Sequence, residues 1–180
     1  MVERSATAEM WVGRGAYFAV ALVVVFVSLL PMQTVPRNWA GPDVMVALTM
    51  CWAARRPDFV PAVLVALILL LHDFIYMRPP GLWAVLVVIA SETLRRRSHD
   101  LRAVPYMLEW ATVAAAVIGI FMAYRFAHAV FAIPQVPLAP HMFQMVLTVL
   151  SYPVVAFGSY LALGITRPAP GEVDALGHRI

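Results

Sequence analysis

Six apolar segments, separated by short polar or proline-containing stretches, make up most of the chain. They run roughly over residues 15–30, 42–54, 58–76, 81–94, 104–131 and 141–163. At a helical rise of about 1.5 Å per residue, the third spans about 28 Å and the sixth about 34 Å, enough to cross a hydrocarbon core about 30 Å thick. The second and fourth span only about 20 Å each, so each is a candidate for a tilted, broken or re-entrant element. The pattern predicts an all-α, polytopic membrane protein with six transmembrane segments, two of them short.

Proline and aspartate mark the predicted boundaries of the segments. Pro61 falls in the first turn of the third segment, where it is tolerated, whereas Pro153 lies inside the sixth and predicts a kink. Asp43 and Asp58 suit helix starts by charge and by capping chemistry. Other prolines at or between segment ends include Pro31, Pro36, Pro57, Pro79, Pro80, Pro105, Pro134, Pro137 and Pro140.

The composition agrees with a membrane protein. Apolar residues make up 62% of the 180 residues and charged residues 13%, whereas a soluble domain has about 45–50% and about 25%. These values exclude a disordered chain, a disulfide-rich scaffold and an ordinary soluble enzyme. The single cysteine, Cys51, excludes an internal disulfide and a multi-cysteine metal site, and its apolar surroundings predict a buried structural thiol.

The arginines predict the orientation in the membrane. All thirteen basic residues are arginine. With six crossings and the N-terminus inside, the outer side receives only Arg37 and Arg78, with Arg125 near the outer end of the fifth segment. The inner side receives Arg4, Arg14, Arg55, Arg56, Arg95, Arg96, Arg97, Arg102, Arg167 and Arg179. This positive-inside asymmetry predicts six true crossings with both termini cytoplasmic.

Two further expectations concern the ends of the segments. Five tryptophans lie near segment ends and predict an interfacial belt: Trp11, Trp39, Trp52, Trp83 and Trp110. Residues 1–166 are expected to form one transmembrane domain, followed by a short, disordered cytoplasmic tail over 167–180.

Motifs for catalysis and for metal or nucleotide binding are missing from the sequence. It has no Walker loop, no GxGxxG, no His-x-x-x-His and no Cys-x-x-Cys. The Gly158-Ser159 pair would need a histidine base and an oxyanion hole to act as a hydrolase, and neither is signalled. The sequence therefore predicts no catalytic, cofactor or metal site.

A few ionisable residues in or near the apolar segments are functional candidates because burying charge in a membrane is costly. Glu92 lies one turn before Arg95 and Arg96, which predicts a local ion pair. Glu109 is expected to form an interfacial pair, with Arg102 on a similar helix face. The apolar middles of the first, third and sixth segments favour a scaffold over a pump.

Two places remain open to alternative interpretations. Asp73 lies about 22 Å into the third segment, near its outer end. It is either a helix-end aspartate beside Arg78 or a fixed polar contact to another helix or subunit. Arg125 and His128 share a helix face, and Arg125 either extends outward to the interface or contacts an acidic group of a partner.

The third and fourth segments carry a family resemblance. The start Arg55-Arg56-Pro57-Asp58, the apolar run that ends at Asp73, and the turn from Arg78 through Pro79-Pro80 to Gly81 resemble the signature region of the MreD family. MreD is the small integral membrane subunit of the bacterial rod-shape machinery. The rest of the chain is similar to that family in hydropathy and length only.

The resemblance implies a non-enzymatic shape-determining subunit without cofactors. Its partners would be an MreC-like membrane protein, the penicillin-binding protein 2 and RodA-type synthase and, indirectly, cytoskeletal MreB at the inner membrane. It also implies a fold similar to the substrate-binding subunits of energy-coupling-factor transporters, so the alternative is a small-molecule-binding transporter subunit, which needs a closed pocket with convergent polar groups. Asp73 and Gly81 match family positions, and the prolines with Gly81 predict a stiff turn with close helix packing. The candidate partner or packing residues are Asp73, Arg78, Gly81, Arg125 and His128.

Overall fold

The computed structural model describes residues 2–30, 40–102, 104–135 and 137–165. Over these residues the chain forms six α-helices and one 3-10 helix, and no strand, which confirms the all-α prediction. The tail predicted over 167–180, together with Arg37 and Trp39, lies outside the described residues. The elements are α1 (Val2–Leu29), α2 (Val44–Arg55), η1 (Pro57–Phe59), α3 (Ala62–Ile75), α4 (Leu82–Arg102), α5 (Tyr106–Val130) and α6 (Leu138–Leu163).

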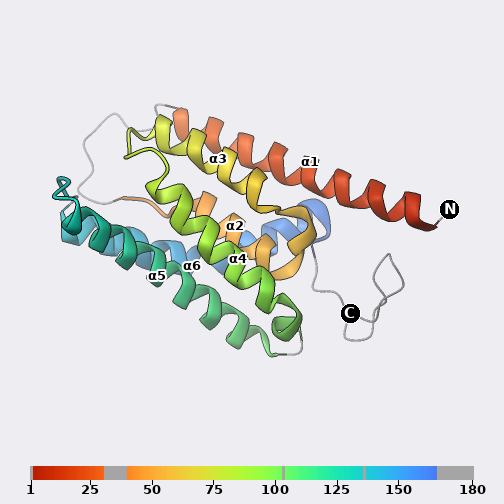
Figure 1. The fold of residues 1–180 in the computed structure, drawn as a ribbon. Coiled ribbons are helices and arrows are strands. Elements are labelled where there is room, and N and C mark those ends of the chain that lie inside the picture. Colours follow the sequence, from red (N-terminus) through yellow and green to blue (C-terminus); the bar gives the residue numbers. More distant parts are fainter. Residues whose placement is uncertain (1, 31–39, 103, 136, 166–180) are drawn as a thin grey trace.

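Successive α-helices run in opposite directions along the bundle, and the N-terminal part of α1 projects beyond the other helices (Figure 1). One end of the bundle, where α2 and α4 finish, is called the arginine end. It carries Arg55, Arg56 and the run 95–97. The opposite end, with the α3–α4 turn and the α5–α6 connection, is called the hairpin end. Of the described arginines, it carries only Arg78 and Arg125.

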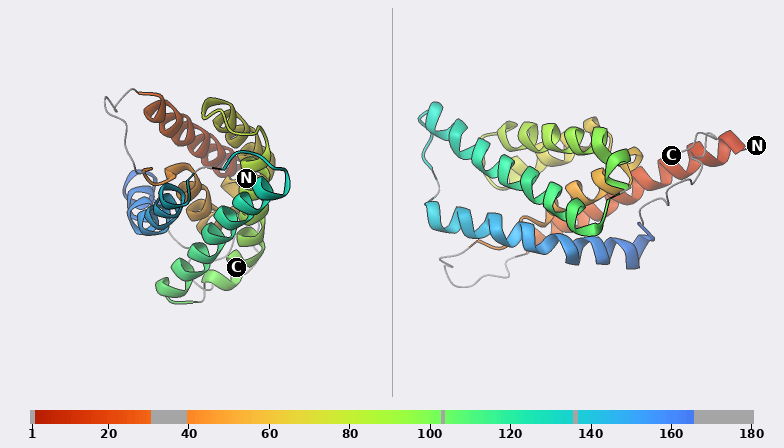
Figure 2. Two further views of the ribbon diagram at one scale, coloured as in Figure 1. Left: turned by 90° about the vertical axis from the view of Figure 1, so that its left-hand side faces the viewer. Right: turned by 90° about the horizontal axis from the view of Figure 1, so that it is seen from below.

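The short helix α2 forms the centre of the bundle. Its residues from Met45 to Ala54 are all buried, and it packs against α4 and α6, with further contacts to α1, η1 and α5. The end-on view in Figure 2 shows it surrounded by the other helices. A helix that is hydrophobic all round is stable when it is covered on every side. The second apolar segment, whose helix is about 18 Å long, is therefore a core helix of the bundle.

The start of α3 differs from the prediction. The helix begins at Ala62 instead of Asp58, because η1 intervenes and Pro61 occupies the N-cap with extended backbone (φ −64°, ψ 145°). The pyrrolidine ring removes a donor and disfavours helical geometry in the residue before it, so η1 does not continue into α3.

Asp43 does cap α2 as predicted, since its Oδ1 accepts a hydrogen bond from the Val46 N–H at 3.1 Å.

Helix α4 is longer than the fourth apolar segment predicts. It continues past Leu94 through the arginines and reaches 21 residues, or about 31 Å, because arginine is a good helix former. Helix α6 begins before the predicted boundary and contains Pro153. Among the described helices, α1 from Thr7, α5 and α6 are long and apolar enough to cross a membrane by length and composition, whereas α2 and α3 are shorter.

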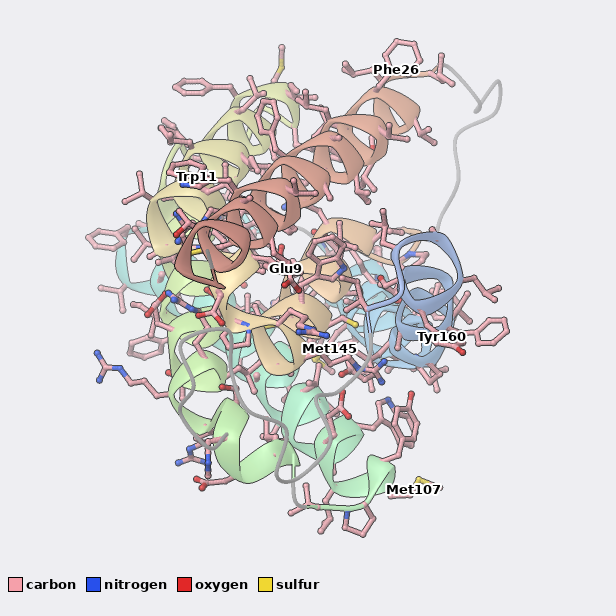
Figure 3. The ribbon with its side chains drawn as sticks, turned by 90° about the vertical axis from the view of Figure 1, so that its right-hand side faces the viewer. Glu9, Trp11, Phe26, Met107, Met145 and Tyr160 are labelled. Atoms are coloured by element: carbon pink, nitrogen blue, oxygen red, sulfur yellow. The ribbon has the colours of Figure 1, made fainter. Side chains whose placement is uncertain are left out.

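The tryptophans that the structure describes do not form a common interfacial belt. Trp11 is exposed and points outward (Figure 3), but Trp52 and Trp83 are buried in the core. The indole Nε1 of Trp52 donates to Ser159 Oγ at 3.1 Å, and the ring of Trp83 packs edge-on against Phe121 at 5.1 Å between centroids. Large aromatic rings stabilise a core strongly, and the indole N–H of Trp52 has a hydrogen-bond partner inside the core. Cys51 is also buried, as predicted.

Large apolar side chains cover the outside of the bundle. Phe26, Phe74, Phe126 and Phe157 are each more than 60% exposed, on α1, α3, α5 and α6. Figure 3 shows the outward position of Phe26. A soluble monomer rarely exposes so continuous an apolar surface, so this exterior is suited to contact with lipid.

Candidate functional site

Asp73 joins two helices at the hairpin end. It is fully buried in the last turn of α3. Its Oδ2 accepts hydrogen bonds from the Gly81 N–H at 3.0 Å and the Ala84 N–H at 3.3 Å. The first N–H groups of a helix have no intrahelical acceptors, and the positive end of the helix dipole favours a nearby anion. Asp73 therefore caps α4 from a neighbouring helix, and its side chain makes a polar contact between helices.

Gly81 is required by its backbone conformation. Its φ of 89° lies in a region that only glycine adopts easily, and this conformation directs its N–H toward Asp73. A Cβ built at Gly81 would meet no atom within 4 Å. Among the described residues no helix packs closely against this glycine, so within the chain it serves the turn. Close packing against a partner helix stays a prediction.

Arg78 pairs with a different aspartate than the nearest one in sequence. Its Nη1 lies 3.6 Å from Oδ2 of Asp43, and its guanidinium stacks over Trp83 and Tyr76 with 4.8 and 5.0 Å to the ring centroids. The Asp43 N–H in turn donates to Thr148 Oγ1 on α6 at 2.9 Å. The turn between α3 and α4 is therefore linked to the start of α2 and to α6.

These residues and the buried His72 of α3, whose charged neighbours are Asp43, Asp73 and Arg78, form the polar cluster. We define it as Asp43, His72, Asp73, Arg78 and Trp83. Several of its buried atoms have no hydrogen-bond partner among the described residues: Asp43 Oδ2, His72 Nδ1, Asp73 Oδ1 and Trp83 Nε1. Such groups in protein interiors are normally paired or hydrated. The polar cluster thus combines two carboxylates and one guanidinium, and it retains capacity for further hydrogen bonds.

Arg125 and His128 lie at the same end of the bundle but contact the α5–α6 connection. Arg125 Nη2 donates to Gln135 Oε1 at 2.7 Å. His128 is buried, and its Nδ1 donates to the carbonyl of Pro134 at 3.3 Å. The structure therefore brings Asp73, Arg78 and Gly81 together in one turn and places Arg125 and His128 at the neighbouring connection.

The sequence did not reveal the main polar link at the arginine end. Glu109 is buried on α5, where its Oε1 accepts from Arg55 Nε at 2.9 Å and from the Tyr152 hydroxyl. One carboxylate thus joins α2, α5 and α6. Among the described residues the charged partner is Arg55, and the side chain of Arg102, with which a pair was predicted, lies outside them. The signal that the sequence offered for this pair was the arginine distribution, which placed Arg55 at this end of the bundle.

The chemistry of these sites is that of helix capping and charge pairing. In the described part of the chain, no group of three or more histidine, cysteine, aspartate or glutamate side chains is placed to hold a metal ion. The hydroxyl of Ser159 accepts the Trp52 indole N–H.

A comparison of the chain with protein-family models, with curated proteins and with solved structures finds no match in any of the three.

Proposed function

We propose that the protein is a non-catalytic scaffold subunit of the bacterial cell-shape and peptidoglycan elongation complex, similar to MreD. The observation that carries the proposal is the capping of α4 by Asp73 through Gly81 and Ala84. Together with the Arg78 N–H bond to the Asp73 carbonyl, it unites Asp73, Arg78 and Gly81 from the resemblance in one hairpin. The other buried carboxylates also link structural elements: Asp43 caps α2 and Glu109 joins three helices. Such use of acidic groups suits a scaffold.

The proposed setting is the inner membrane, with both termini in the cytoplasm. The gathering of arginines at one end of a bundle of alternating helices supports this orientation. The hairpin end then faces the outer side, where we place the contact with an MreC-like membrane protein and with penicillin-binding protein 2 and the RodA-type synthase. MreB is reached indirectly from the cytoplasmic side.

Depletion of the protein in its host tests this function. We expect rods to become spheres, or the zone of elongation to be disturbed in a species with little rod growth, while vitamin uptake stays unchanged. Expression of the wild-type chain from a second locus should restore shape. Normal shape together with a specific uptake defect would refute the proposal in favour of a transporter subunit.

Two hairpin variants then relate the structure to the shape phenotype. Asp73→Asn keeps an oxygen that can accept the N–H groups of Gly81 and Ala84, so it should restore shape. Gly81→Leu forces a branched side chain into a φ of 89°, so it should break the turn and fail to restore shape. Both variants must be compared at equal membrane levels. Full loss in both, with binding of the MreC-like partner intact, would indicate chemistry at Asp73 instead of scaffolding.

The alternative, a small-molecule-binding subunit of an energy-coupling-factor transporter, needs an enclosed pocket with convergent polar groups. A pocket of about 340 Å³ lies between α4 and α5, but it is open to the outside and is largely apolar. This geometry supports the scaffold over the transporter subunit.

A further inference from the structure

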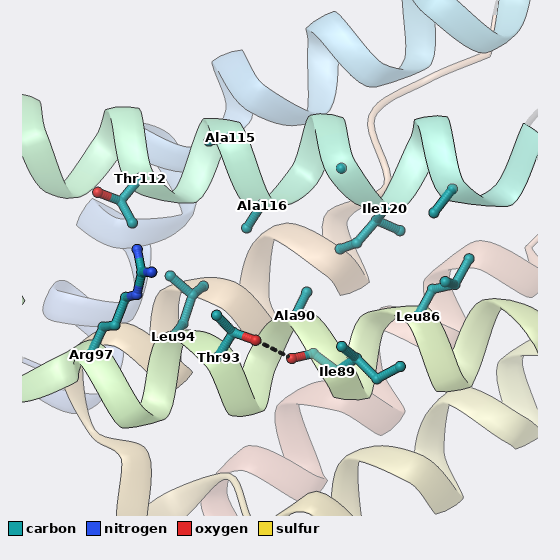
Figure 4. A pocket seen from close by; sticks show the side chains of 12 residues that line it. Leu86, Ile89, Ala90, Thr93, Leu94, Arg97, Thr112, Ala115, Ala116 and Ile120 are labelled. Carbon is teal, nitrogen blue, oxygen red and sulfur yellow. Dashed lines mark hydrogen bonds between the residues drawn. The ribbon is translucent and has the colours of Figure 1, made fainter. Parts of the chain in front are cut away.

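The groove between α4 and α5 has a floor of small side chains (Figure 4). Helix α5 contributes Ala115, Gly119 and Ala123, which are spaced four residues apart and therefore share one face. A Cβ built at Gly119 would meet no atom within 4 Å. Helix α4 contributes Ala90 on the opposite side. The space above these small residues, between the two helices, is about 340 Å³.

The polar atoms in the lining are almost all engaged. The Thr93 hydroxyl donates to the Ile89 carbonyl at 2.8 Å, and the Thr112 hydroxyl donates to the Leu108 carbonyl at 2.7 Å. The side chain of Ile89 is largely exposed and continues the apolar exterior of the bundle into the groove. The groove thus offers an apolar surface with a single charged side chain, that of Arg97.

Arg97 lies at the arginine end of the groove, and its guanidinium points across it toward α5 (Figure 4). It is exposed, and it forms no ion pair with any residue that the structure describes. Of the acidic residues nearby on α4, Glu92 is bound by Arg95, and Asp100, three residues beyond Arg97, makes no ion pair with it. A positive charge that has no ion-pair partner among the described residues therefore lies at one end of an apolar groove.

We propose that this groove binds one acyl chain of an anionic phospholipid, with the phosphate of the headgroup held by Arg97. From Arg97 to Leu86 the groove follows α4 for about 16 Å, which matches one leaflet of a hydrocarbon core about 30 Å thick. Basic sites between transmembrane helices on the cytoplasmic side favour anionic headgroups, and the guanidinium matches phosphate geometry. The inference requires insertion in a membrane with the arginine end at headgroup depth, and it does not require the cell-shape function.

Native mass spectrometry of the full-length protein in detergent, titrated with phosphatidylglycerol or phosphatidylcholine of identical acyl chains, tests the proposal. We expect a one-lipid complex that favours phosphatidylglycerol. Arg97→Gln should weaken that complex about tenfold, since a charge-assisted contact is lost. The matched control is Arg96→Gln, because Arg96 is also exposed but does not line the groove. Gly119→Leu should weaken binding of both lipids by filling the groove.

Several results would overturn the proposal. Both lipids carry a phosphate, so equal binding of the two would show that the groove does not select a headgroup of net negative charge, contrary to the proposal. Equal losses in the Arg96 and Arg97 variants would indicate general surface charge. Undiminished binding in Gly119→Leu, or displacement of the lipid by a partner transmembrane helix, would assign the groove to another occupant. Because Arg97 is exposed, its glutamine variant is expected to fold, and an unchanged melting temperature verifies this for each variant.

Discussion

Removal of the Glu109 carboxylate is expected to destabilise the bundle more than removal of any exposed charge. The side chain of Glu109 is 1% exposed and that of its partner Arg55 is 11% exposed. Glu109→Ala leaves the guanidinium buried without its partner, and breaking a buried ion pair in this way costs about 3–5 kcal/mol. The Tyr152 hydroxyl also loses its acceptor. We therefore expect the free energy of unfolding to fall by at least about 3 kcal/mol.

A double-mutant cycle separates the ion pair from simple loss of packing. Arg55→Met removes the charge that Glu109→Ala leaves uncompensated, and replacing both members of a buried pair by apolar groups is often close to neutral. The double variant should therefore regain most of the stability lost in Glu109→Ala. The coupling between the two positions should be at least about 1 kcal/mol, as is typical of residues in direct contact.

The assay is equilibrium unfolding of the purified protein in detergent micelles, followed by circular dichroism. The control is Glu92→Ala, because the predicted Glu92–Arg95 pair does form but its side chains are 31% and 26% exposed. Exposed pairs contribute about 0–1 kcal/mol. If Glu109→Ala costs no more than this control, or if the effects of Glu109→Ala and Arg55→Met simply add, the buried carboxylate does not hold the helices together as argued.

Two further predictions concern a close helix contact and the orientation in the membrane. Gly13→Ala should destabilise the protein by about 1–3 kcal/mol through overpacking, because its Cβ would lie 2.4 Å from an aromatic ring of η1. Gly15→Ala, where a Cβ meets nothing within 4 Å, should instead be neutral or stabilising, and melting temperatures that rank the two variants the other way contradict the close approach. In a Cys51→Ala background, Phe131→Cys should react with a membrane-impermeant thiol reagent in intact cells, whereas Arg96→Cys should react only after lysis. Labelling at position 96 in intact cells would reverse the proposed orientation.

The sequence by itself determined the helical class and the local interactions. Asp43 caps α2 through an N–H three residues away, and Glu92 pairs with Arg95 at the same spacing. Such contacts are decided within one helical turn, so a linear pattern predicts them. The arginine distribution likewise predicted which helix ends lie together, because alternate loops of a bundle meet at the same end.

Only the tertiary structure decided which apolar faces contact protein and which polar groups meet. Lipid tails are as apolar as a protein core, so hydropathy does not distinguish the buried helix α2 from a lipid-facing helix. For the same reason Trp52 and Trp83 near segment ends looked interfacial, although both lie in the core. The partners of Arg78 and Glu109 lie 35 and 54 residues away in the sequence. Their pairing depends on the rotation of each helix against its neighbours, which side-chain packing sets and local periodicity does not encode.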